Sequence, residues 1–596
     1  MLGEDIHKKW VLVKEWTGRD LNPRPPACEA GDLPLIYRPS EMTKSLSSLL
    51  ASMGIIYFYI YIASYGVIMD ETLGGKIEPR DYQINIYKQA IRENTLVVLP
   101  TGMGKTIIAA MVANFIITEK NERVLFLAPT KPLVSQHFET FRKLLDMDSP
   151  AIAKFTGEVD NQDRLLDWST SKVVISTPQV VVNDLRSGMI DFSKYGLIIF
   201  DEAHRASGNY AYVDIAREFI QYKKRLILAL TASPGSKREK LDEVTEGLSI
   251  ENVIIKTEND RDVQKYVNSV RIDAKILDLP SSVKSARPLL QEIYSEILSK
   301  IRESGIFKNE PINRRTMASK IPELVRRARE GENNLFGLIP YISGAIRVDY
   351  AMEYLESQGT EIALDYINEI MSSQEKTLRR TAAMIKKSPV FQQLIDELQE
   401  SAARDHSNPK LNAILELCND TLSENPDSRI IVFTHFRKTA MILTRFLSEK
   451  STLAKPVRFV GQSSKGEDEG INQKKQEGII RGFREGEFNV LVATSVAEEG
   501  LDIPSTDLVI FYEPVPSEIR TIQRRGRTGR HHAGKVIILI YKDSRDSAYY
   551  YSSIRKEAAM RKNINRYESG AEKSPVKDNP MEISPNRSRT SLDDFS

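Results

Sequence analysis

The sequence predicts an α/β protein with two doubly wound parallel-sheet domains and an all-helical insert domain between them. Between residues 76 and 270, continuous runs of Val, Ile and Leu alternate with amphipathic helical patterns. Strands this uniformly apolar are typical of a parallel sheet that helices cover on both faces. A second set of such runs begins near residue 406, whereas residues 281–405 have a helical pattern with few strand signals.

These patterns divide the chain into four parts after residue 68. We expect the first sheet domain at 69–270, the helical insert at 271–405, the second sheet domain at 406–555 and a disordered tail at 556–596. The expected strands are TLVVLP, RVLFLAP, KVVIST, GLIIFDE and RLILALTAS in the first domain, and SRIIVFTHF, PVRFVGQ, FNVLVATSV, DLVIFYEP and KVIILIY in the second.

Composition excludes several classes of protein. Lys and Arg number 83 against 81 Asp and Glu, so the formal net charge is only +2 and any basic surface must be local. Two cysteines, Cys28 and Cys418, exclude a disulfide framework and a multi-cysteine metal site, and they suit a reducing compartment such as the cytoplasm. Seven histidines show no ligand spacing, so the expected metal is Mg²⁺ that arrives with a nucleotide.

The first 68 residues differ from the rest. Residues 45–69 carry no charge and are long enough to span a bilayer, so a membrane anchor is one interpretation. We prefer a non-native leader, because TGRDLNPRPPACEAGDLPLIYRPS resembles the peptide produced when gene prediction reads through a transfer-RNA gene. Met69 would then be the natural initiator, and no membrane association is expected.

The stretch LPTGMGKT, residues 99–106, is nearly a P-loop, in which backbone N–H groups cradle phosphates at a helix N-terminus. It follows a buried-type strand and opens a helix, although Leu99 replaces the first glycine. Lys105 is expected to reach the β- and γ-phosphates, and the Thr106 hydroxyl to hold Mg²⁺. The predicted ATP-binding residues of the loop are Thr101, Gly102, Met103, Gly104, Lys105 and Thr106.

Two further motifs are expected to complete the site. Asp201 and Glu202 end the strand of GLIIFDE, where ligands bind in doubly wound folds. Asp201 is expected to hold Mg²⁺ through water, and Glu202 to orient and deprotonate the attacking water. In IQRRGRTGR, Arg527 and Arg530 are candidate arginine fingers, since the second domain has no P-loop of its own. ATP would then act as a clamp on domain motion.

These motifs, ordered along residues 77–555, resemble those of superfamily-two helicases, whose sheet domains are RecA-like. RDYQ, with Gln83, is similar to the adenine-reading Q motif, and APTKPLVSQH, STPQVV, TASPG, FTHFRKTA and ATSVAEEGLDI resemble other helicase motifs. More narrowly, DEAHRASGNYAYV, LTASPG and the block from FVGQSS to GLDIP resemble the helicase half of archaeal Hef and its relative, the Fanconi anaemia M-type translocase.

The resemblance implies further roles. Thr130, Thr177 and Thr494 occupy positions that touch the nucleic-acid backbone, a contact that gives affinity without sequence information. Thr231 and Ser233 would couple hydrolysis to strand movement. Gln523 stands where the family contacts the γ-phosphate and Asp502 where it meets the ribose, so the expected catalytic residues are Lys105, Asp201, Glu202, Gln523, Arg527 and Arg530.

Basic clusters in the helical insert bear on which nucleic acid the protein binds. NRRTMASKIPELVRRARE and KTLRRTAAMIKKS cluster Arg and Lys on expected helices. Such faces are often merely solvated, but Hef relatives embrace branched DNA with this element, so Arg326, Arg327 and Arg329 are candidate phosphate contacts. Nothing in the chain resembles the E-R-K-x-x-x-D motif of the XPF-type nuclease that often follows archaeal Hef, so such a nuclease would be a separate partner.

The leading hypothesis is an ATP-dependent translocase that acts on forked or branched DNA in replication-fork repair and recombination, so a cytoplasmic, nucleoid-associated protein is expected. One alternative is a double-stranded RNA-stimulated ATPase of the Dicer or RIG-I-like type, and another is a non-catalytic DNA-binding scaffold. The final residues, NRSRTSLDDFS, resemble the peptide by which DNA enzymes dock on the sliding clamp, with Leu592 and Phe595 at its apolar positions. A solvated tail is the alternative for that segment.

Overall fold

The computed structural model describes Leu73 and residues 75–568, with gaps at 146, 148–150, 158, 160, 234, 236–237, 267–269, 309, 333, 405–407, 463–469, 498–502, 518–520, 522–523 and 525–533. The expected leader, with its alternative as an anchor, and the expected clamp-docking peptide with Leu592 and Phe595 lie outside the described residues. Within the part that is described, no helix combines the length and the apolar character needed to cross a bilayer.

The first sheet contains seven parallel strands in the order β3-β4-β2-β5-β6-β1-β7. Its strands are β1 Thr95–Val98, β2 Arg123–Leu127, β3 Ile152–Phe155, β4 Val173–Ser176, β5 Tyr195–Phe200, β6 Leu226–Thr231 and β7 Asn252–Ile255. The helices of this domain are α3 Asp81–Ala90, α4 Lys105–Thr118, α5 Lys131–Leu145, α6 Asn161–Thr170, α7 Pro178–Arg186, α8 Ala211–Phe219, α9 Arg238–Gly247 and α10 Arg261–Gln264, with short 3₁₀ turns at Phe192–Lys194 and Ala203–Arg205.

Helices cover both faces of this sheet, as the sequence predicts. Along β1, Val97 belongs to one core with residues of α4, whereas Leu96 and Val98 belong to a second core with residues of α8. Because successive strand residues point to opposite faces, two separate cores require that every position of the strand be apolar. The continuous Val, Ile and Leu runs therefore follow from burial on both sides.

The second sheet has six parallel strands in the order β10-β11-β9-β12-β13-β8. Its strands are β8 Val270–Leu277, β9 Ile430–Phe433, β10 Pro456–Phe459, β11 Val490–Ala493, β12 Leu508–Phe511 and β13 Gly534–Tyr541. The helices of this domain are α17 Pro409–Glu424, α18 Arg437–Lys450, α19 Gln473–Glu485 and α21 Arg545–Glu568, with a 3₁₀ turn at Ser495–Ala497. Two cores again flank the sheet.

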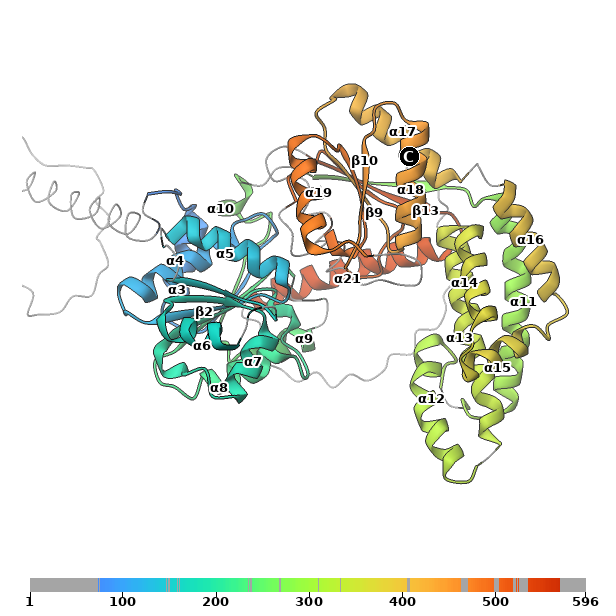
Figure 1. Cartoon of the computed structure of the whole chain (residues 1–596), viewed down its shortest axis with the longest axis horizontal. Helices are drawn as coiled ribbons and strands as arrows, with labels where there is room; N and C mark the ends of the chain where they lie inside the picture. Colours follow the sequence, from blue (N-terminus) through green and yellow to red (C-terminus); the bar gives the residue numbers. More distant parts are fainter. Residues whose placement is uncertain are drawn as a thin grey trace, which may run out of the picture. The chain divides into compact units, whose positions relative to one another are not determined.

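A bundle of helices forms the insert, with a core of its own. Its helices are α11 Ser281–Glu303, α12 Arg314–Arg329, α13 Leu335–Gln358, α14 Thr360–Ser372, α15 Lys376–Ile385 and α16 Phe391–Arg404. The expected class, two RecA-like parallel-sheet domains around a helical insert, is confirmed (Figure 1).

All strands predicted from the sequence are present, but the prediction omits β3, β7 and β8, each at an edge of its sheet. Edge strands need less apolar sequence because one side has no neighbour, and no residue of β8 is fully buried. β8 pairs with β13 along its whole length, so residues 270–277 belong to the second sheet. The helices of the insert begin at Ser281 rather than near residue 271, and α21 continues to Glu568, past the expected domain end at residue 555.

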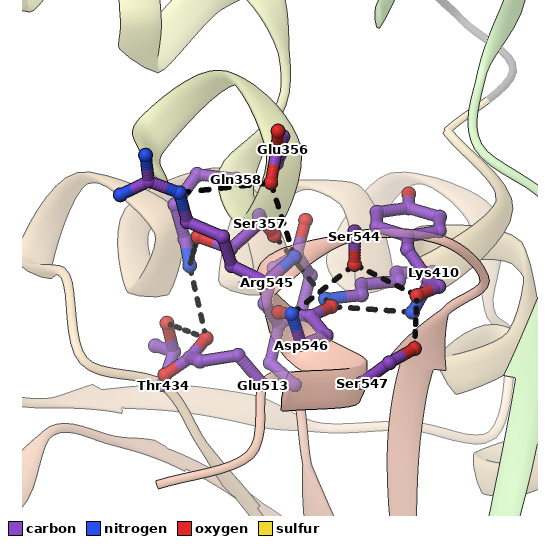
Figure 2. A network of polar contacts seen from close by, with 12 residues as sticks. Glu356, Ser357, Gln358, Lys410, Thr434, Glu513, Ser544, Arg545, Asp546 and Ser547 are labelled. Carbon is purple, nitrogen blue, oxygen red and sulfur yellow. Dashed lines mark hydrogen bonds and ion pairs between the residues drawn. The ribbon is translucent and has the colours of Figure 1, made fainter. Parts of the chain in front are cut away.

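A polar network joins the end of α13 to the second sheet (Figure 2). Gln358 Nε2 donates to Glu513 Oε2 at 3.2 Å, and Gln358 Oε1 accepts from the Thr439 hydroxyl at 2.7 Å. Lys410 Nζ lies 2.7 Å from Asp546 Oδ2, and both side chains are wholly buried. Lys410 Nζ also donates to the carbonyl of Ser357 in α13 at 3.2 Å, so the ion pair within the second domain holds the lysine that contacts the insert.

Candidate active site

The loop between β1 and α4 has the backbone of a phosphate-binding loop. Gly102 and Gly104 have φ of 79° and 78°, a left-handed conformation that glycine adopts without strain. A Cβ atom at Gly104 would also overlap the Gln83 side-chain amide. Leu99, which replaces the first glycine, buries its side chain in the core below, while its carbonyl accepts from Lys105 Nζ at 2.9 Å. The loop is therefore formed without the first glycine.

The RDYQ motif, which resembles the adenine-reading Q motif, contacts this loop directly. Gln83 is buried at the start of α3, and its Nε2 donates to the carbonyl of Met103 at 3.2 Å. Tyr82, which sequence reasoning did not single out, donates its hydroxyl to the same carbonyl at 2.7 Å. Because two side chains share one backbone acceptor, the motif fixes the middle of the loop before any nucleotide binds.

Asp201 and Glu202 follow β5, which is separated from β1 in the sheet by β6 alone. Asp201 is buried, and burial alone would raise the pKa of its carboxyl. The neighbouring His137 and Lys105 outweigh that effect, so the pKa of Asp201 lies below its ordinary value and the group stays ionised. Glu202 has φ of 49°, an uncommon value for a residue with a side chain.

A chain of polar contacts connects Glu202 to the end of β6. His204 Nδ1 lies 3.3 Å from Glu202 Oε2 and 3.1 Å from the Thr231 hydroxyl. Thr231 Oγ1 in turn donates to the carbonyl of Ser233 at 3.0 Å. The Asp-Glu-Ala-His turn is thus in direct contact with Thr231, which the resemblance relates to the coupling of hydrolysis to strand movement.

The residues expected to touch nucleic acid follow three different strands. Thr130 follows β2 and Thr177 follows β4, so both lie at the same carboxyl edge as the P-loop and Asp201, because all these strands are parallel. The Thr130 hydroxyl is buried without a hydrogen-bond partner in the described part of the chain. Thr494 lies at the corresponding edge of the second sheet, after β11.

The donor set at the first edge fits Mg²⁺. A carboxylate, a hydroxyl and nearby phosphates supply the hard oxygen ligands that Mg²⁺ prefers, and this ion commonly takes only one or two protein ligands. Asp201 and Thr106 are these candidates. Among the described residues, no group of three or more His, Cys, Asp or Glu could hold a metal ion.

Four residues of the expected site lie outside the described residues: Gln523, Arg527, Arg530 and Asp502. Their roles stay predictions. Arg524, which is described, is wholly buried, and its guanidinium lies 5.0 Å from the centre of the Phe433 ring and 5.3 Å from that of Phe511. Arg524 itself therefore packs against residues of the second sheet.

On α12, two of the three candidate phosphate contacts already have acidic partners. Arg326 pairs with Glu330 at 3.0 Å, and Arg327 pairs with Glu332 at 2.6 Å. Arg329 is exposed and has no acidic partner in the described part of the chain. The spacing of Arg326 and Glu330, four positions apart on a helix, is a signal that sequence analysis could have used, whereas the Arg327–Glu332 pair forms across the end of α12.

Helix α15 and the turn after it carry a second basic surface with a different character. Thr381, Ala382 and Ile385 face the bundle core, and the cations lie on the opposite side. All of them are exposed and none has an acidic partner among the described residues: Lys376, Arg379, Arg380, Lys386 and Lys387. We call these five residues the α15 basic surface.

Comparison with known proteins agrees with this arrangement. Residues 76–236 match the family described as type III restriction enzyme, res subunit, and residues 409–532 match the helicase conserved C-terminal domain. A P-loop and an Asp-Glu-Ala-His turn at one sheet edge, followed by a second sheet with this C-terminal domain, define an ATP-dependent helicase of superfamily two.

The structure of the Hef helicase domain from Pyrococcus furiosus is 42% identical in sequence, with a TM-score of 0.60, over 80% of this chain and 98% of that one. The chain belongs to the family of Hef and Mph1 helicases. A candidate ATP-dependent RNA helicase of Methanocaldococcus jannaschii is 39% identical over 82% of this chain and 60% of its own length. The ATP-dependent DNA helicase MPH1 of Pyricularia oryzae is 34% identical over 79% and 44%. The chain thus spans less than two thirds of these two relatives.

Proposed function

We propose that this helicase is a DNA translocase that remodels forked and other branched DNA. The proposal depends most on one observation: cations of the α15 basic surface have no acidic partners among the described residues and lie on an insert that is linked to the second sheet domain through Gln358 and Ser357. Unpaired, exposed cations are the groups that bind phosphate backbones without reading sequence. Relatives named as DNA helicases and the likeness to the Hef helicase domain support it.

At the ATP site, we assign roles to side chains that lie at one sheet edge. Lys105 would offset charge on the β- and γ-phosphates, and Glu202 would orient the attacking water and accept its proton. Asp201 and Thr106 would hold Mg²⁺, which supplies further charge stabilisation to the phosphates. Arg527 and Arg530 would complete the site from the second domain, and Thr130, Thr177 and Thr494 would contact the strand backbone.

A second candidate function is RNA-directed. It is favoured by the M. jannaschii relative, whose description names RNA. Backbone contacts of the kind proposed for the three threonines do not by themselves distinguish DNA from RNA, because the 2′-hydroxyl decides that choice. We prefer DNA, since several relatives that cover about 80% of this chain are named as DNA helicases.

The test compares ATPase stimulation of the full chain by forked DNA, linear duplex DNA and duplex RNA at one salt concentration. We expect forked DNA to stimulate most. Stronger stimulation by duplex RNA would favour the second candidate, and no stimulation by any of the three would favour a binding scaffold. A control with Lys105→Ala excludes contaminating ATPase.

A further inference from the structure

A histidine that none of the assigned roles includes holds the proposed metal-binding carboxylate. His137 is buried in the middle of α5, and its Nε2 lies 2.9 Å from Asp201 Oδ2. The backbone of Asp201 is held as well: its N–H donates to Leu127 O at 2.9 Å, and its carbonyl accepts from the Tyr212 hydroxyl at 2.8 Å. With the main chain fixed, the contact from His137 determines how the carboxylate is turned.

The surroundings of His137 indicate which partner donates. Its Nδ1 is buried and has no hydrogen-bond partner in the described part of the chain. With the proton on Nε2, the imidazole donates to the carboxylate, and Nδ1 keeps a lone pair rather than a buried N–H that lacks an acceptor. The ring packs on Phe126 of β2, with centroids 4.4 Å apart, which sets its plane.

This arrangement has the form of an outer-shell contact to a metal ligand. When one carboxylate oxygen is engaged by a fixed donor, the other is presented in one direction, and loss of such partners typically weakens metal binding by about 10–100-fold.

The position of His137 on α5 adds a second consequence. The helix begins at Lys131, directly after Thr130, whose buried hydroxyl has no partner among the described residues. His137 is seven positions beyond Thr130, about 10 Å along the same helix. One rigid element therefore connects the residue proposed to meet the nucleic-acid strand with the residue that holds Asp201.

We propose that His137 is a positioning residue: it orients Asp201 for Mg²⁺ and, through α5, transmits strand binding at Thr130 to the ATP site. The second half of this proposal depends on the proposed function, whereas the first half does not.

Two variants separate the hydrogen bond from packing. His137→Phe keeps a ring against Phe126 but removes the donor, whereas His137→Gln offers a side-chain N–H at a similar reach. The readouts, measured without nucleic acid, are Mn²⁺ binding in the presence of ADP by electron paramagnetic resonance, fluorescent ADP binding without metal, and the melting temperature. The fold stimulation of ATPase by forked DNA is then measured for each variant.

We expect His137→Phe to weaken Mn²⁺ binding by about tenfold or more, with metal-free ADP binding and melting temperature near those of the parent. His137→Gln should recover most of the metal affinity, and stimulation by forked DNA should fall in His137→Phe. Unchanged Mn²⁺ affinity in His137→Phe would overturn the positioning role, as would equal loss in both variants with a matching drop in melting temperature. Normal metal binding with no stimulation in the parent itself would instead contradict the proposed function.

Discussion

Charged side chains are arranged in opposite ways at the carboxyl edge of the first sheet and on the faces of the insert. Asp201 is buried and is held by a neighbouring side chain and by backbone contacts, whereas most cations of α12 and α15 are exposed. A buried carboxylate that is held in place acts strongly on a cation such as the proposed Mg²⁺, because little water screens it. An exposed cation acts through counterion release and adds with its neighbours. We therefore expect ATP hydrolysis at the carboxyl edge of the first sheet and nucleic-acid binding on the faces of the insert.

The insert itself contains a further contrast. Arg326 and Arg327 of α12 are paired with glutamates, while the α15 basic surface has no such partners among the described residues. An exposed ion pair contributes little to stability, but it must be broken before its cation can serve a phosphate. Equal numbers of cations on two helices therefore do not imply equal binding.

The largest expected effect is on Lys105. Lys105→Ala should lower ATP turnover by about 10³-fold or more, since the protein then lacks a cation that acts on the transferred phosphoryl group. Fork binding should remain close to that of the parent, because the insert faces are untouched. Turnover and fork affinity, measured on the same preparation, check this. Parent-level turnover would remove the P-loop assignment, and a parallel loss of fork binding would contradict the separation of the two regions.

The next effect concerns stability. Lys410→Met leaves Asp546 buried without its cation, so we expect a loss of about 3–5 kcal/mol in the free energy of unfolding. Burial already raises the pKa of Asp546, and removal of the ammonium should raise it further. Denaturant unfolding measures the change.

The matched control is Lys275→Met, which removes a lysine paired with Glu416 at 2.6 Å on the surface of the same domain. This exposed pair should contribute at most about 1 kcal/mol. If the two substitutions cost the same, burial does not distinguish the pairs as we argue.

A smaller effect is expected from the α15 basic surface. Replacement of Lys376, Arg379 and Arg380 by Gln should weaken fork binding and lower the slope of log K against log salt by about 2.7, because each duplex phosphate that a cation neutralises adds about 0.9 to that slope. Basal ATPase should persist. An unchanged slope would mean that this surface is only solvated.

The smallest effect is expected from α12. The same Gln replacements at Arg326, Arg327 and Arg329 should lower the slope by about 0.9, since only Arg329 has no acidic partner in the described part of the chain. Titration of fork binding across salt concentrations, side by side with the α15 variant, checks the difference. A larger decrease from α12 than from α15 would reverse our ranking of the two helices.

Much of the fold could be predicted because central strands have a recognisable local sequence pattern. β1, β2, β4, β5 and β6 lie inside the first sheet, and burial on both faces requires continuous apolar runs. The P-loop is local as well, since Gly102, Gly104 and Lys105 act within one turn between a strand and a helix. The sequence by itself therefore determined the fold class, the ATP loop and the acidic turn.

Only the tertiary structure decided features that depend on residues far apart in the chain. β3, β7 and β8 are edge strands, and their less uniformly apolar sequences become strands only when a neighbour pairs with them. His137 and Asp201 are 64 positions apart, so no spacing rule predicts their contact. Local sequence patterns largely determine backbone conformation, but a contact between residues far apart in the chain forms only when the chain folds.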